Sequence, residues 1–236
     1  MSNYGLIIQN ERTQRAFDEG YTSLNFAAGG VTYRHSGNIF AFEFHCPTRP
    51  VLFYRASAVN GYCAPHYVWD KGGGWYRAYT LGEAEVFAFS THVSPNLDTY
   101  GMRVWSRSGK LVYQSGDETI RPIGVISVPH ENAWHSGSGR KIAFSLHGIA
   151  RVINADFIGN RMTFRNTLIQ SISGGVRPRL ITTYDGPIIA ESELRKAFFG
   201  HSMMELRDLN PNANIPMLIV DVHDIKYPGM RASTIY

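Results

Sequence analysis

The stretch YGMRVWSRSGKLVYQSG at residues 100–116 repeats an earlier stretch, YGLIIQNERTQRAFDEG at residues 4–20, without a gap. Tyr-Gly opens both copies, and Ala16-Phe17 in the first copy matches Val112-Tyr113 in the second. Each copy has two apolar segments separated by a polar turn, which predicts a β-hairpin. Gly109 in the second turn can adopt the positive φ that tight hairpins need. The repeat therefore indicates an internal duplication of β structure.

A second match lies downstream of the first. FAFEFH at residues 40–45 resembles IAFSLH at residues 142–147, and both alternate large apolar residues with smaller or polar ones. This alternation is typical of a strand with one face toward a core. The two matches predict two tandem β-sandwich-like units, residues 1–95 and 96–236, with a boundary near Ser94-Pro95-Asn96. A single larger sandwich built from two similar halves is the alternative.

The rest of the chain also favours an all-β fold. Turn signals rich in Gly, Pro and Asn separate segments of strand length. The predicted strands are residues 51–59, 75–80, 86–92, 123–128, 149–157, 161–166, 168–172, 180–184 and 217–222. One segment differs, because Glu191, Glu193 and Lys196 are good helix formers with the acids first and the base last. We expect one short helix near residues 191–199 that ends at Gly200.

Composition excludes several classes of protein. The chain has 236 residues, of which 44% are hydrophobic, 13% aromatic and 18% charged, so intrinsic disorder is not expected. No apolar run reaches the ~18 residues of a membrane-spanning helix, and the first five residues lack the basic and apolar pattern of a secretory signal, so we expect none. The net charge of +4 comes from scattered arginines, which does not favour nucleic-acid binding. Cys46 and Cys63 are too few for a zinc site, and we expect both thiols to be reduced.

No motif predicts a catalytic or metal site. HENAWH at residues 130–135 places its histidines five apart, whereas a zincin helix needs them four apart. Asp221 and His223 could share one side of a strand as a metal half-site, but such residues more often close a strand. Cys63 and His66 flank Pro65, a spacing that does not favour a nucleophile–base pair. We therefore expect no catalytic residue, no metal and no cofactor. A hydrolase whose facing carboxylates the sequence does not reveal stays an alternative.

Aromatic residues are the best candidates for a binding surface. Lys71-Gly72-Gly73-Gly74 lacks the spacing of a phosphate-binding loop, and the aromatic residues on either side favour a hairpin tip. Aromatic side chains supply contact area at little cost in conformational entropy. The alternative is that these rings fold inward. The candidate interface residues are Tyr62, Tyr67, Trp69, Trp75 and Trp134.

The duplicated hairpin resembles one found in minor virion proteins of tailed bacteriophages, which are small tail-tip, baseplate or fibre-associated proteins. Tyr100 to Ser115 is the closer match, and the copy at residues 4–20 lacks the turn glycine. The resemblance implies a structural role in the virion, by protein–protein assembly with other virion proteins after synthesis in the host cytoplasm. It also implies several copies around a symmetry axis. It carries over no catalytic residue, and together with the charge and composition we expect no enzyme, no nucleic-acid contact and no membrane insertion. The alternatives are a carbohydrate- or receptor-binding module that contacts a host surface glycan and a capsid decoration protein.

Overall fold

The structure is a computed structural model that describes residues 6–9, 14–17, 24–91, 103–105, 108–109, 111–114, 118–128, 133–135, 140–146, 151–156, 158–187 and 215–227. Its regular elements are all β-strands, and each strand pair is antiparallel, so the all-β prediction is confirmed. Within these residues there is no helix with the length and apolar character needed to cross a membrane. The helix expected at residues 191–199 lies outside the described residues.

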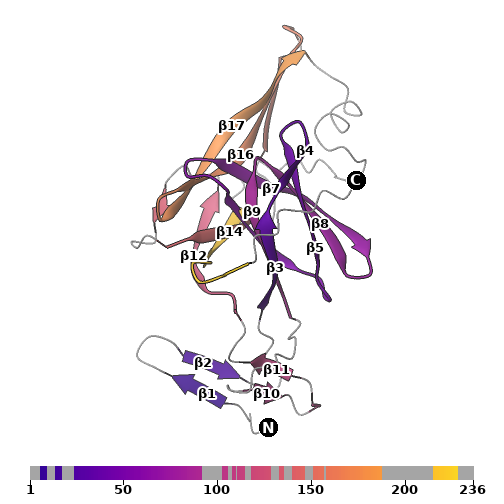
Figure 1. Ribbon diagram of the computed structural model, residues 1–236. Helices are drawn as coiled ribbons and strands as arrows, with labels where there is room; N and C mark the ends of the chain where they lie inside the picture. Colours follow the sequence, from indigo (N-terminus) through magenta and orange to yellow (C-terminus); the bar gives the residue numbers. More distant parts are fainter. Residues whose placement is uncertain are drawn as a thin grey trace.

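Two large sheets form the body of the molecule (Figure 1). The six-stranded sheet has the order β12 (Pro122–Val128), β18 (Ile215–Asp221), β14 (Ile142–Leu146), β6 (Val51–Ala56), β9 (Ala84–Ser90) and β3 (Asn25–Val31). The eight-stranded sheet has the order β13 (Trp134–His135), β17 (Gly175–Pro187), β16 (Arg161–Ile172), β7 (Tyr62–Gly72), β8 (Trp75–Leu81), β5 (Ile39–His45) and β4 (Tyr33–Ser36), with β15 (Arg151–Asp156) beside β16.

The strand order is repeated in the two halves of the chain. From its outer edge to its middle, the six-stranded sheet runs β3, β9, β6 on one side and β12, β18, β14 on the other. The eight-stranded sheet runs β5, β8, β7 on one side and β13, β17, β16 on the other, and β4 and β15 are additions. Both halves therefore place their strands in the same sequence order, as an internal duplication requires.

The two halves join edge to edge and share both sheets. In the six-stranded sheet Phe144 of β14 pairs with Tyr54 of β6, and in the eight-stranded sheet Ile169 of β16 pairs with Cys63 of β7. Each sheet thus contains strands from both sides of the expected boundary at residues 95 and 96, which itself lies outside the described part of the chain. This is the arrangement of one sandwich built from two similar halves.

The sequence match between residues 40–45 and 142–147 does not join equivalent strands. FAFEFH lies in β5 of the eight-stranded sheet, whereas the described part of IAFSLH lies in β14 of the six-stranded sheet. By strand order β14 corresponds to β6, and β5 corresponds to β13. The resemblance arises because a strand with large apolar residues on its inner face has the same pattern in either sheet.

The middle strands of the six-stranded sheet are buried on both faces. Its inner face packs against the eight-stranded sheet in a core that includes Tyr54, Val86 and Phe144. Its outer face carries a second apolar cluster around Phe53 and Phe87, covered by residues that flank the sheet. A strand buried on both faces reads as an unbroken apolar run instead of an alternating one. Val86-Phe87-Ala88-Phe89 in β9 follows that rule.

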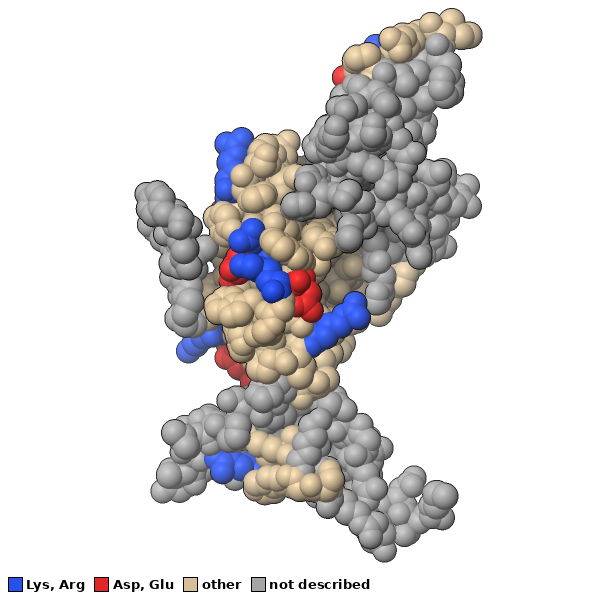
Figure 2. All heavy atoms as spheres, turned by 90° about the vertical axis from the view of Figure 1, so that its right-hand side faces the viewer, with Lys and Arg blue, Asp and Glu red and all other residues tan. Residues whose placement is uncertain are grey.

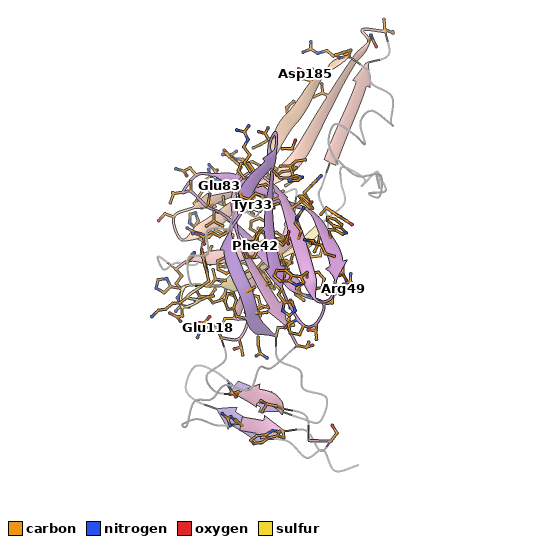
Figure 3. All side chains as sticks on the ribbon, turned by 45° about the vertical axis from the view of Figure 1, so that its right-hand side comes forward. Tyr33, Phe42, Arg49, Glu83, Glu118 and Asp185 are labelled. Atoms are coloured by element: carbon orange, nitrogen blue, oxygen red, sulfur yellow. The ribbon has the colours of Figure 1, made fainter. Side chains whose placement is uncertain are left out.

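The two repeated stretches form the expected hairpins. β1 (Leu6–Gln9) pairs with β2 (Gln14–Phe17), and β10 (Arg103–Trp105) pairs with β11 (Leu111–Gln114). Gly109 has φ +78° in the second turn, as its position in the sequence predicts. The two hairpins lie side by side at one end of the molecule, apart from the sandwich (Figures 1 and 3). Backbone hydrogen bonds from Phe26 to Glu118 and from Ile120 to Leu24 tie together the segments that lead into the sheets.

At the opposite end β16 and β17 continue beyond the sandwich as a ribbon, with β15 on one side (Figure 1). Asp185 lies near the far end of this ribbon, and Glu118 lies near the hairpins (Figure 3). Arg161 donates two hydrogen bonds to Asp185, at 2.8 and 2.7 Å. Both side chains are exposed, so this pair contributes little to stability.

The segment after β18 is held against the outer face of the six-stranded sheet. The Lys141 ammonium lies between the rings of Phe87 and Tyr227, 5.4 and 5.3 Å from their centroids. It also pairs with the Glu85 carboxylate, which Arg55 contacts from 3.4 Å. Cation–π contacts and an ion pair thus act on the same ammonium group. Burial, together with the charge of Glu85, raises the pKa of Tyr227 to about 12.

The raised pKa of Tyr227 predicts a loss of stability in alkali. The folded protein keeps this phenol protonated above its ordinary pKa of 10. Its contribution to the free energy of unfolding is therefore complete below pH 10 and is lost as the pH rises toward 12. We expect Tyr227→Phe to reduce the fall in the free energy of unfolding across that interval, as measured by urea denaturation at successive pH values. An equal fall in both proteins would contradict the assignment. A residual fall is expected, because burial also raises the pKa of Tyr54.

Candidate functional site

The register of the eight-stranded sheet places aromatic and charged residues on its outer face. In β8, Tyr76 and Ala78 belong to the core, so the alternate positions Trp75, Arg77 and Tyr79 face outward. The neighbouring strands add residues in register with these three. We call this surface the aromatic face, and it comprises Tyr33 of β4, Glu43 of β5, Tyr67, Trp69 and Lys71 of β7, and Trp75, Arg77 and Tyr79 of β8.

The rings of the aromatic face are partly braced and partly exposed. Tyr67 stacks on Tyr79 with ring centroids 6.2 Å apart, and His35 meets the same Tyr79 ring edge-on at 5.2 Å. Tyr79 is consequently buried. Tyr33, Trp69 and Trp75 remain 37%, 40% and 48% exposed. The stacked rings of Tyr67 and Tyr79 thus support a face on which three further rings are exposed to a partner.

A charged cluster lies among these rings. Lys71 Nζ is 2.6 Å from Glu43 Oε1, and Arg77 donates to Glu43 Oε2 through Nε at 2.8 Å and Nη2 at 2.6 Å. The hydrogen bonds from Lys71 and Arg77 lower the pKa of the Glu43 carboxyl below its usual value. The Arg77 guanidinium also lies over the Trp69 ring, 5.6 Å from its centroid. These contacts hold both cations in fixed positions beside an exposed indole.

The outer face continues into the second half of the chain. Tyr62, Gln170 and Arg177 pair in one row across β7, β16 and β17. Ile169 and Val176 beside them belong to the core, which places the row on the outer side. Figure 2 views the side of the molecule on which β5 and β8 lie, and charged side chains of both signs gather there within uncharged surface.

The structure brings together three of the five aromatic residues that the sequence singles out. Tyr67, Trp69 and Trp75 share the aromatic face, and Tyr62 lies on the same side of β7 nearer the joint between the halves. Trp134 lies elsewhere, because it packs against the core beside Gly124 of β12. A Cβ at Gly124 would lie 3.1 Å from Trp134 Cζ2, so glycine makes room for the indole.

Sequence reasoning missed Tyr33, Tyr79 and the charged cluster around Glu43. The signal was present in WYRAYTL at residues 75–81, where Trp, Arg and Tyr occupy alternate positions of one strand. It could not show which strands lie beside β8. Tyr33 and Glu43 reach the face only through pairings of β4 and β5.

Among the residues considered for a catalytic or metal site, the two cysteines are buried and Asp221 is paired. Cys46 and Cys63 are free thiols buried in the core, and burial raises the pKa of Cys63. Asp221 pairs with Arg140 at 2.9 Å and accepts a hydrogen bond from the backbone N–H of His223. Of HENAWH, Trp134 and His135 form β13, and its first three residues lie outside the described ranges. In the described part of the chain, no three or more His, Cys, Asp or Glu side chains gather to hold a metal ion.

Comparison with known proteins gives no relative: no family model matches the chain, and no curated protein and no solved structure matches it significantly.

Proposed function

We propose that the chain is a structural component of a tailed-phage virion, associated with the tail at its tip, its baseplate or an attached fibre or spike. It acts by protein–protein assembly and not by catalysis. The observation that carries this proposal is the pair of duplicated hairpins, which lie side by side and apart from the sandwich. Their sequences resemble the hairpin of minor tail proteins.

A hairpin of two short strands favours an assembly role. A two-stranded hairpin is marginally stable in water and gains stability by packing against another surface. Trp105 of β10 is 55% exposed, and tryptophan is one of the residue types enriched in the energetic hot spots of protein interfaces. Two linked copies of one docking element bind together more tightly than either does alone. The proposed partners are other virion proteins and further copies of this chain around a symmetry axis.

Mass spectrometry of purified particles tests this proposal. We expect peptides of the chain in particles of the phage that encodes it, and in the tail fraction once heads and tails are separated. Particles with no such peptides would show that it is not a virion protein. Recovery with the heads alone would make it a capsid protein and refute the association with the tail.

A substitution in the second hairpin tests the proposed mechanism. We expect Trp105→Ala to reduce incorporation into particles by about tenfold or more, because truncating an interface tryptophan commonly weakens binding by ~2 kcal/mol. Val125→Ala is the matched control, since Val125 is 66% exposed on β12, away from the hairpins. Equal incorporation of both variants would exclude this hairpin as the docking element.

A further inference from the structure

We propose that the aromatic face is a saccharide-binding site whose ligand is an oligosaccharide with acidic substituents. The proposed function implies that such a ligand would be displayed on the host cell surface. Only this location of the ligand depends on the proposed function. The binding chemistry follows from the face itself. It depends on three features: exposed rings on a rigid sheet, polar groups fixed among the rings, and an excess of positive charge.

The exposed rings suit the apolar side of a sugar. A pyranose presents a surface of C–H groups, which packs on the face of an indole or a phenol. Tyr33, Trp69 and Trp75 are exposed on three different strands of one sheet. The stacked pair of Tyr67 and Tyr79 supports the centre of the face. The rings are therefore positioned before the ligand arrives, which lowers the entropic cost of binding.

The polar groups suit hydroxyl recognition better than a protein partner. Glu43, Lys71 and Arg77 lie among the rings of the aromatic face, whereas the core of a protein–protein interface is depleted of lysine and glutamate. A guanidinium has five N–H donors and an ammonium has three. The contacts with Glu43 and Tyr79 use only part of this set. Fixed donors beside an exposed indole are the combination that orients a polyhydroxylated ligand.

The charge of the face favours an acidic sugar. Lys71 and Arg77 share a single carboxylate, Glu43, so the cluster keeps one positive charge. Arg177 adds another on the same outer side of the sheet, in the row of Tyr62 and Gln170. Guanidinium groups bind carboxylate and phosphate by paired, charge-assisted hydrogen bonds. A saccharide bearing uronic acid or phosphate groups therefore complements both the rings and the charge.

A printed array of bacterial surface polysaccharides, probed with the purified full-length chain, tests the inference. We expect binding to acidic polysaccharides that weakens as salt increases, because ion pairing at a surface is screened. Trp69→Ala and Tyr33→Ala should each reduce the bound signal by about tenfold or more. Val125→Ala is the control, since Val125 is 66% exposed but lies on β12 of the six-stranded sheet, away from the aromatic face. Near-ultraviolet circular dichroism should show that all three variants remain folded.

Three results would overturn the inference. They are the absence of binding to any polysaccharide, binding to neutral ones alone, and binding that Trp69→Ala and Tyr33→Ala leave unchanged. If Trp69→Ala lowers incorporation into particles while the array stays blank, the face is a docking surface for a virion protein. Failure of this inference can be distinguished from failure of the proposed function. Binding on the array does not require the virion, and detection of the chain in particles does not require a glycan.

Discussion

Phe144→Ala is expected to lower the free energy of unfolding by about 3–5 kcal/mol, the range for truncating a fully buried phenylalanine. Phe144 is fully buried on the inner face of the six-stranded sheet, with its ring centroid 6.3 Å from that of Tyr54. It is also the residue of β14 that pairs with β6, the strand of the other half. The ring packs across the joint between the halves, so its loss should destabilise both of them. We therefore expect one unfolding transition for the whole molecule. Urea denaturation followed by fluorescence and by far-ultraviolet circular dichroism measures this.

Two results would contradict this expectation. A loss below ~1 kcal/mol would mean that the joint is loosely packed, and two separate transitions with only one shifted would mean that the halves fold independently. Val125→Ala is the control, because Val125 is largely exposed and its truncation should change stability by no more than about 0.5 kcal/mol.

Gly82→Ala is expected to be the second most damaging change, at about 2–5 kcal/mol. Gly82 lies between β8 and β9 with φ +78°, a conformation that costs an L-residue roughly 1–2 kcal/mol. A Cβ at this position would lie 2.1 Å from the backbone carbonyl oxygen of Tyr62. Backbone atoms cannot move away by changing rotamer, so relief requires shifting a strand, and overpacking of this kind adds about 1–3 kcal/mol.

Gly37→Ala separates the two causes of that loss. Gly37 also has a positive φ, +53°, but nothing lies within 4 Å of the position its Cβ would take. This variant should lose only the conformational part, about 1–2 kcal/mol. Equal losses in the two variants, measured by thermal and urea denaturation, would show that the contact with Tyr62 relaxes without cost.

The fold class could be predicted from sequence because it depends on local patterns. Alternation in β5 and β8, the turn glycines of β7 and β8, and the repeated hairpins all signal strands without knowledge of their neighbours. Four of the described strands, β3, β4, β7 and β13, escaped prediction. β7 contains Pro65 and two register shifts, which break its alternation. β3 contains adjacent glycines, and a Cβ at Gly30 would lie 2.4 Å from the ring of Phe42.

The candidate site was less predictable, since it depends on which strands become neighbours. Trp69 and Trp75 could be found because they flank one hairpin tip. Glu43 lies far from them in sequence, and only the pairing of β5 with β8 brings it opposite Arg77. Trp134 was a candidate for the binding surface but packs beside Gly124 instead. Composition cannot distinguish an exposed indole from one that packs beside a glycine. Strand pairing between distant segments is the information that local patterns lack.

The joint between the halves has a consequence for synthesis. In the middle of each sheet, a strand that the ribosome makes early pairs with one that it makes much later. These pairs are β6 with β14 and β7 with β16. Until β14 (Ile142–Leu146) and β16 (Arg161–Ile172) emerge, the edges at β6 and β7 of the nascent first half stay unpaired, and such edges are templates for pairing with another chain. A neighbouring nascent chain offers the same late strands, and their exchange would produce an intertwined dimer with the same contacts. High local concentration during translation therefore favours swapped dimers, and slow, dilute synthesis favours the monomeric sandwich.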